Sequence, residues 1–226
     1  MPTWSQALLL VHVVGGASAL AGALGAMATQ AAGLAHHWHR RTGLAFFWGM
    51  AILFVTSIPL AVLASSILLL LVALFSFYMA FSGLRHARRR DGRVSTLDRT
   101  AAWGMVATGV LMLGLAGFLG LSGDGMWVVL LVFGLLAISL GRADVAVFRD
   151  GLPRGRERIA YHLRMMLGGT IAAVTGFVTT NMPTDPGFLA WLLPTVVLVP
   201  ILVWWSRRVR AVGTAPLFRL SGGDRD

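Results

Sequence analysis

Long apolar runs separated by short polar segments organise the whole chain. A bilayer core of about 30 Å needs roughly 20 apolar helical residues. Seven runs lie near that length, at residues 7–30, 42–64, 66–84, 100–121, 126–140, 160–181 and 187–205. The pattern predicts an all-α fold, a polytopic membrane helix bundle of about seven transmembrane helices. No polar segment is long enough to fold alone, so we expect one transmembrane bundle over residues 1–206 and a basic, disordered cytoplasmic tail over residues 207–226.

Composition and the placement of charge support a membrane protein. The chain is 57% hydrophobic and 12% charged, whereas soluble domains carry about 25% charged residues. Almost all basic residues fall in segments 36–41, 85–99 and 142–158 or follow residue 206, and the alternate connections carry none. This alternation predicts an outside N-terminus and a cytoplasmic C-terminus, in a multi-pass protein of the bacterial inner membrane.

The net charge of +10 is therefore a topology signal, with anionic lipids at the cytoplasmic face as its expected partner. A nucleic-acid partner is not expected. The first apolar run is followed by basic residues rather than by a cleavage site of small residues, so we expect no cleavable signal. The chain has no cysteine, which excludes disulfides, thiolate metal sites and iron–sulfur clusters.

Small residues and an internal similarity indicate how the spans are organised. Glycine and alanine line the first and fourth runs, notably at Gly15, Gly109, Gly114 and Gly117, which predicts close helix–helix contact. Residues 90–118 also align without a gap on residues 149–177. The alignment predicts that segments 66–121 and 126–181 are a parallel repeat.

Candidate chemistry gathers in the stretch 36–43, which contains three histidines and two arginines between two apolar runs. At the same predicted boundary we expect His39 and His162, with His86 as a third ligand, to hold a metal ion or an axially ligated haem b. Arg40 and Arg164 are suited to bind anionic groups such as haem propionates. His36 and His37 are expected to be plain loop residues.

Other interpretations of these residues stay open. Arginines and histidines at a boundary also serve as lipid anchors. His12 lies inside the first span, roughly 20 Å or more from the other histidines, and it is either functional or hydrogen-bonded to a neighbouring helix. Asp144 is expected to form a local ion pair with Arg142. No serine–histidine–acid constellation is visible, so catalytic residues cannot be assigned.

Several of these residues resemble a family signature. His12 with the glycines after it, and His39-Arg40-x-x-Gly43, are similar to the first half of the bacterial membrane proteins called "domain of unknown function 2306". Arg142-Ala-Asp144 and the segment from His162 to Met166 resemble later motifs of that family, although residues 150–158 look like an insertion. The resemblance covers the first, second, fifth and sixth spans. It implies that His12, His39, Arg40 and His162 matter more than other polar residues.

The sequence leaves two alternative functions, which belong to different classes. The first is a membrane redox protein in which histidines bind haem or a divalent metal, with a membrane quinone as electron partner. The second is a non-enzymatic assembly factor or partner subunit that uses its small-residue helix faces to bind another membrane protein. The glycine-lined spans and the lack of a complete catalytic set favour the second, and the gathering of ligand-type residues favours the first.

Overall fold

The computed structural model describes residues 3–89 and 91–213, and within them the secondary structure consists of seven long helices. These are α1 (Thr3–Ala31), α2 (His36–Leu63), α3 (Ile67–Arg88), α4 (Thr96–Leu121), α5 (Trp127–Asp150), α6 (Gly155–Asn181) and α7 (Phe188–Val212). Each helix is long and apolar enough to cross a bilayer. The predicted all-α, multi-pass architecture is confirmed.

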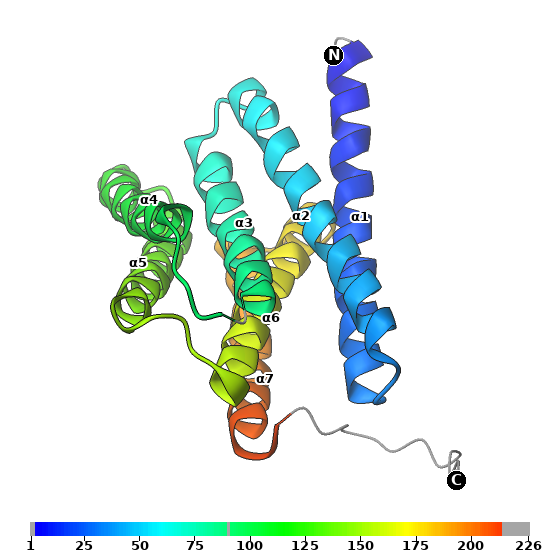
Figure 1. Cartoon of the computed structure of the whole chain (residues 1–226). Coiled ribbons are helices and arrows are strands. Elements are labelled where there is room, and N and C mark those ends of the chain that lie inside the picture. The colour runs from blue at the N-terminus through cyan, green and yellow to red at the C-terminus, as the bar shows by residue number, and fades with distance from the viewer. Residues whose placement is uncertain (1–2, 90, 214–226) are drawn as a thin grey trace, which may run out of the picture.

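Helices α3 and α6 occupy the middle of the bundle (Figure 1). They pack against each other, with the α1–α2 pair on one side and the α4–α5 pair on the other. Helix α7 packs chiefly on α6. Because α3 and α6 are surrounded by other helices, polar side chains that face the contact between them are shielded from both lipid and water.

The helices extend further than the apolar runs predicted. Segments 36–41, 85–99 and 142–158 were expected to be loops, yet most of their residues are helical. Likewise, α7 continues through residues 207–212, so a tail that starts at residue 207 is wrong for these positions. Long arginine side chains can reach a polar boundary from a helix end, so a helix can run past its apolar window. Residues 214–226, the rest of the expected tail, lie outside the described residues.

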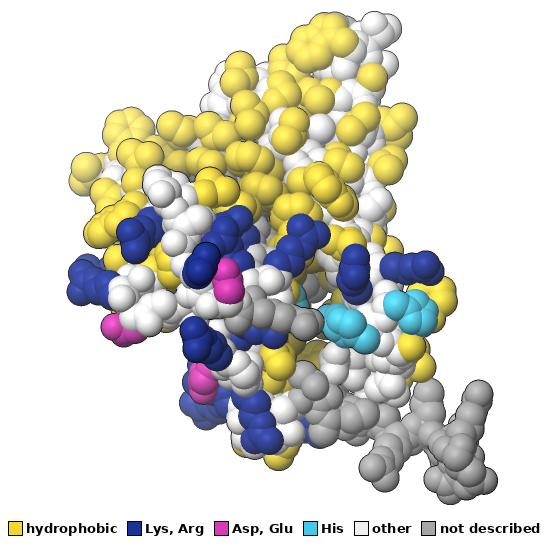
Figure 2. All heavy atoms as spheres, in the orientation of Figure 1, with side chains coloured by type: hydrophobic (Ala, Val, Ile, Leu, Met, Phe, Trp, Pro, Cys, Tyr) yellow, Lys and Arg dark blue, Asp and Glu magenta, His cyan; other side chains and the backbone are white. Residues whose placement is uncertain are grey.

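Arginine and histidine side chains gather at one end of the molecule, below a largely apolar body (Figure 2). We call this end, where α2 and α6 begin and α3, α5 and α7 finish, the basic end. Its one-sided charge is what the alternation along the sequence implies, and its cytoplasmic location stays a prediction. The parallel repeat also stays a prediction, and Arg90, at one end of the aligned region, lies outside the described residues.

Helices α1 and α2 approach closely through glycines, as predicted for the first span. A Cβ atom added to Gly15 would lie 2.6 Å from the side chain of Ile52. A Cβ atom on Gly49 of α2 would lie 2.5 Å from the backbone nitrogen of Ala19. Atoms at such distances would overlap, so these glycines allow the two backbones to come together.

Helix α4 follows the prediction at one of three glycines. A Cβ on Gly109 would lie 2.7 Å from the carbonyl oxygen of Gly134 in α5. A Cβ on Gly114 or Gly117 would meet no atom within 4 Å. The prediction of helix contact is therefore confirmed at Gly109. It is wrong at Gly114 and Gly117, because both glycines are exposed and lie away from the contact with α5.

Candidate functional site

A cluster of polar side chains lies between α3, α5 and α6, toward the basic end. We call it the Asp144 cluster; its members are Tyr78, Ser82 and His86 of α3, Asp144 of α5, and Tyr161 and Arg164 of α6. The α3 members are spaced four residues apart and so share one face of that helix. The α6 members are three residues apart and share a face in the same way.

Asp144 is the best-shielded acid of the described residues, with 0% of its surface exposed. Its Oδ2 atom accepts hydrogen bonds from the Tyr78 hydroxyl and, at 3.1 Å, from the Ser82 hydroxyl. The predicted ion pair between Asp144 and Arg142 is wrong. Two residues apart on a helix means roughly 200° around its axis, so Asp144 points inward and Arg142 is exposed.

His86 is buried next to Asp144, with 2% of its surface exposed. Its Nδ1 atom lies 2.8 Å from the carbonyl oxygen of Ser82. A carbonyl can only accept, so Nδ1 carries the proton and Nε2 of the neutral ring carries a lone pair. The ring stacks on Tyr161 with centroids 4.2 Å apart, and the guanidinium of Arg164 covers the other side of the cluster, 4.3 Å from the Tyr161 ring centre.

Four atoms of the Asp144 cluster are buried without a hydrogen-bond partner among the described residues. These are the acceptors Asp144 Oδ1 and His86 Nε2, and the donors Tyr161 OH and Arg164 Nε. Buried polar atoms are nearly always paired, so the unpaired atoms of Asp144 and His86, which line the same small cavity, indicate a place where a small polar species binds.

A small cavity adjoins the cluster. Its lining includes Tyr78, Ser82, His86 and Asp144, and also Arg85 and Asp98 nearer the basic end. The space available to the centre of a water molecule is about 10 Å³, close to the lower limit for one ordered water. The cavity can therefore hold a water molecule but not an organic cofactor.

Arg85 and Asp98 form the wall of this cavity toward the basic end. Asp98 also caps α4, where its side chain accepts from the Ser95 backbone nitrogen at 2.8 Å while Ser95 accepts from the Asp98 nitrogen. The guanidinium of Arg85 binds both carboxylate oxygens of Asp98. The carboxylate of Asp98 is therefore fixed by a helix cap and by a two-pronged arginine contact.

A second group of predicted residues meets between α2 and α6. The rings of His39 and His162 lie 6.4 Å apart, nearly perpendicular to each other. His39 donates from Nδ1 to the carbonyl of Ala26 at 3.0 Å, and His162 donates from Nδ1 to the carbonyl of Gly83 at 2.8 Å. When such a ring is neutral, its lone pair is therefore on Nε2. We call these two side chains the His39–His162 pair.

Of the other predicted site residues, Arg164 and His86 lie apart from this pair, whereas Arg40 lies beside it. Arg164 is two residues beyond His162 on α6 and faces Tyr161 instead. His86 belongs to the Asp144 cluster. Arg40 is exposed next to His39 on α2, and His36 and His37 are helical rather than loop residues, at the start of the same helix.

His12 forms a hydrogen bond to a neighbouring helix, which is one of the two roles that the sequence left open. Its Nδ1 atom lies 2.9 Å from the hydroxyl of Thr56 in α2. That hydroxyl donates its single hydrogen to the backbone, with the Ile52 carbonyl 2.6 Å away, so His12 is the donor of the interhelical bond. His12 thus joins α1 to α2, on a different part of the bundle from the other histidines.

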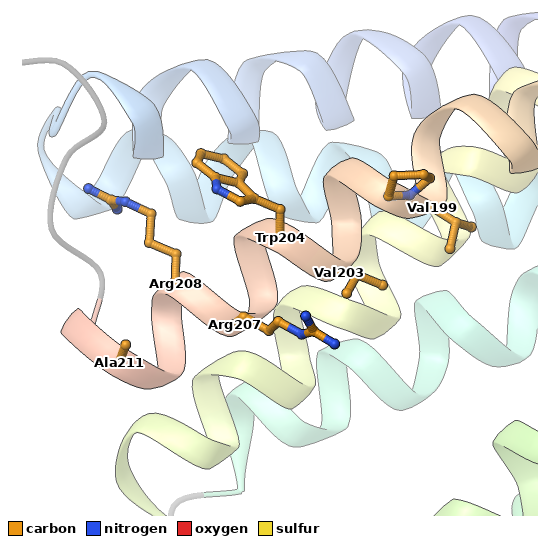
Figure 3. Close-up of a pocket in the computed structure, with 7 residues that line it drawn as sticks. Val199, Val203, Trp204, Arg207, Arg208 and Ala211 are labelled. Carbon is orange, nitrogen blue, oxygen red and sulfur yellow. The ribbon is translucent and has the colours of Figure 1, made fainter.

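A shallow groove runs along the outer side of α7 (Figure 3). Valine and proline side chains line one end, and Trp204, Arg207 and Arg208 line the other. Trp204 and Arg208 rise from the same side of the helix. This arrangement has the polarity of a membrane–water boundary, and none of the histidines lines it.

Three or more histidine, cysteine or acidic side chains do not come together as a metal-binding group anywhere in residues 3–89 and 91–213. No protein-family model, curated protein or solved structure matched the chain in comparison. The geometry of the His39–His162 pair and of the Asp144 cluster therefore has to indicate the function.

Proposed function

We propose that the protein is a membrane redox protein of the bacterial inner membrane, in which His39 and His162 bind haem b as axial ligands. The observation that carries this proposal is the His39–His162 pair itself. Two imidazoles on different helices lie side by side, and each is anchored at Nδ1 by a backbone carbonyl of another element. Histidine ligands are typically held in this way, because the bond at one nitrogen fixes the orientation of the other.

Spacing supports ligation of one metal by both rings. A metal bound to two imidazole nitrogens at about 2.0–2.1 Å each holds the ring centres roughly 5–6.5 Å apart. The observed distance between the ring centres is 6.4 Å. This distance lies within the range that one shared metal ion requires.

The number of ligands favours haem over a free divalent metal. Zinc sites use three or four protein ligands, whereas no group of three or more such side chains in the described residues could hold a metal ion. The His36 ring lies 6.2 Å from the His39 ring, but His36 is exposed at the start of α2. Haem brings four nitrogen ligands of its own, so two histidines complete its coordination. Arg40, exposed beside His39, supplies positive charge for a propionate.

The remaining partners of this proposal follow from the membrane setting. A quinone dissolved in the bilayer is the electron partner, and anionic lipids contact Arg207 and Arg208 at the end of the α7 groove. Membership of the "domain of unknown function 2306" family is part of the same proposal, since its resemblance singles out His39, Arg40 and His162.

The test is an absorption spectrum of the protein purified in detergent from cells supplied with haem precursor, oxidised and then reduced with dithionite. We expect a Soret band and a sharp α-band on reduction, as two histidine ligands produce. His39→Ala and His162→Ala should each lose these low-spin features. His37→Ala is the matched control, because His37 is exposed near the same helix start and should keep the wild-type spectrum.

Two results would contradict the proposal. One is a wild-type preparation without haem that also fails to bind added hemin. The other is an unchanged low-spin spectrum in both the His39 and the His162 variant. A haem-free protein that co-purifies with another membrane protein in fixed ratio would instead support the assembly-factor function, in which the glycine-lined helix faces bind the partner.

A further inference from the structure

The Asp144 cluster has features that the His39–His162 pair does not explain. Asp144 is fully buried, inside a helix that can span a membrane. None of the ion pairs within the described residues includes Asp144. Its hydrogen-bond donors are the two hydroxyls of Tyr78 and Ser82, which are neutral. A carboxylate in this setting is costly to keep charged unless a positive partner binds it.

The unpaired atoms show what the cluster lacks. Asp144 Oδ1 and His86 Nε2 are both acceptors without a donor, and both residues line the small cavity. A water molecule in that cavity can donate to one acceptor, and a proton placed on the carboxyl group supplies a further donor. Burial therefore favours a neutral carboxylic acid at Asp144, beside a cavity that has room for one water molecule.

Access to the cavity differs between its two sides. Toward the bundle interior, Tyr78 belongs to an apolar core that includes Phe75, Met79 and Phe133. Toward the basic end, the wall is the ion pair between Arg85 and Asp98, and 21% of the Arg85 side chain is exposed. The cavity therefore approaches solution at the basic end, through the partly exposed Arg85.

The charged and titratable groups around Asp144 come from four other helices. They are Tyr78, Arg85 and His86 of α3, Asp98 of α4, Tyr161, Arg164 and Glu157 of α6, and Arg210 of α7, which pairs with Glu157. Asp98 is neutralised by Arg85, and Arg210 lies 3.4 Å from Glu157. Arg164 is the cation of the Asp144 cluster, and no ion pair within the described residues joins it to Asp144.

We propose that Asp144 is a proton-binding site, which exchanges a proton with the solution at the basic end through the water-sized cavity shared with His86. On uptake, an O–H bond forms at Oδ1 with a proton taken from hydronium, and water is left behind; release reverses this step. No oxidant or reductant takes part. Tyr78 and Ser82 are positioning residues that hold Oδ2, so that Oδ1 faces the cavity.

The proposal is independent of haem, and infrared spectroscopy of the purified full chain tests it. The probe is the C=O stretching band of a protonated carboxyl group, recorded over a pH series in water and in heavy water. We expect one such band that disappears as pH rises and shifts in heavy water. Asp144→Asn, which keeps the shape of the side chain, should lose the band, and the matched control Asp91→Asn, at an exposed acid, should keep it.

His86→Gln tests the partner role of the imidazole. Removal of the ring should shift the midpoint pH of the band, whereas a merely structural histidine would leave the midpoint where it is. If Asp144→Asn does not fold, Tyr78→Phe replaces it, because loss of the hydroxyl donor must change the frequency of the Asp144 band.

Three results of the infrared experiment support or overturn the proton-binding role of Asp144. A band that Asp144→Asn removes and that titrates with pH supports the proposal. A band that persists in Asp144→Asn, or fails to shift in Tyr78→Phe, belongs to another carboxyl group and overturns it. A band lost in Asp144→Asn but insensitive to pH and to heavy water means a locked proton without exchange, which also overturns it.

Discussion

Two glycines of α4 provide a sharp test of the packing between α4 and α5. Gly109 and Gly117 lie in the interior of the same helix, two turns apart. A Cβ on Gly109 would lie 2.7 Å from the Gly134 carbonyl and 2.9 Å from the Ile138 backbone nitrogen. A Cβ on Gly117 would meet nothing within 4 Å. The same substitution by alanine therefore adds the same methyl group to opposite environments.

The expected change in unfolding free energy has two parts. Alanine favours a helix over glycine by about 0.8–1 kcal/mol, and both variants gain this amount. Gly109→Ala must also push α5 away, because the obstructing atoms belong to its backbone, and overpacking of this kind costs about 1–3 kcal/mol. Gly117→Ala is then more stable than Gly109→Ala by about 1–3 kcal/mol, which corresponds to roughly 2–12 °C in Tm for a chain of this size.

The assay is thermal unfolding in detergent, followed by tryptophan fluorescence or by loss of the monodisperse peak in size-exclusion chromatography. Gly117→Ala should match or exceed the wild-type Tm, and Gly109→Ala should fall below Gly117→Ala. Equal Tm values for the two variants would refute the close α4–α5 contact. A lower Tm for Gly117→Ala alone would show that the other face of α4 is the packed one.

Two further substitutions probe bonds between helices. Asp98→Asn should lower the free energy of unfolding by about 1.5–3 kcal/mol, because it weakens charged hydrogen bonds to Arg85 and in the α4 cap. The control Glu157→Gln removes an ion pair in which 62% of the acid side chain is exposed, and it should lower the same free energy by about 0–1 kcal/mol. Chemical denaturation of both variants measures the difference. Thr56→Val should destabilise the protein by about 0.6 kcal/mol through loss of the acceptor for His12, whereas Thr179→Val, at an exposed hydroxyl bonded within α6, should have a smaller effect in the same assay.

The number of helices was predictable because membrane spans must be apolar over their whole length. That requirement is local in sequence, and seven runs meet it. Helix ends were not predictable in the same way. The segment from Arg142 to Asp150 is charged enough to resemble a loop, yet it continues α5, since its arginines remain exposed while Asp144 and Phe148 turn inward.

The residues of one candidate site were predicted from the sequence, and most residues of the other were not. His39 and His162 were predicted together, because both are ligand-type residues at the same boundary, and the structure places their rings side by side. Tyr78, Ser82 and Tyr161 were missed, although the four-residue spacing of Tyr78, Ser82 and His86 was a visible signal of one helix face. That spacing acquires meaning only once it is known that Asp144 of α5 faces it, which depends on tertiary packing.

One turn of α3 connects the two sites. The carbonyl of Ser82 accepts from His86, and the next carbonyl, of Gly83, accepts from His162. The α6 helix comes near enough for the second bond because Gly83 has no side chain; a Cβ there would lie 3.1–3.2 Å from the side chains of Met165 and Met166. A movement of this turn must therefore disturb both bonds at once.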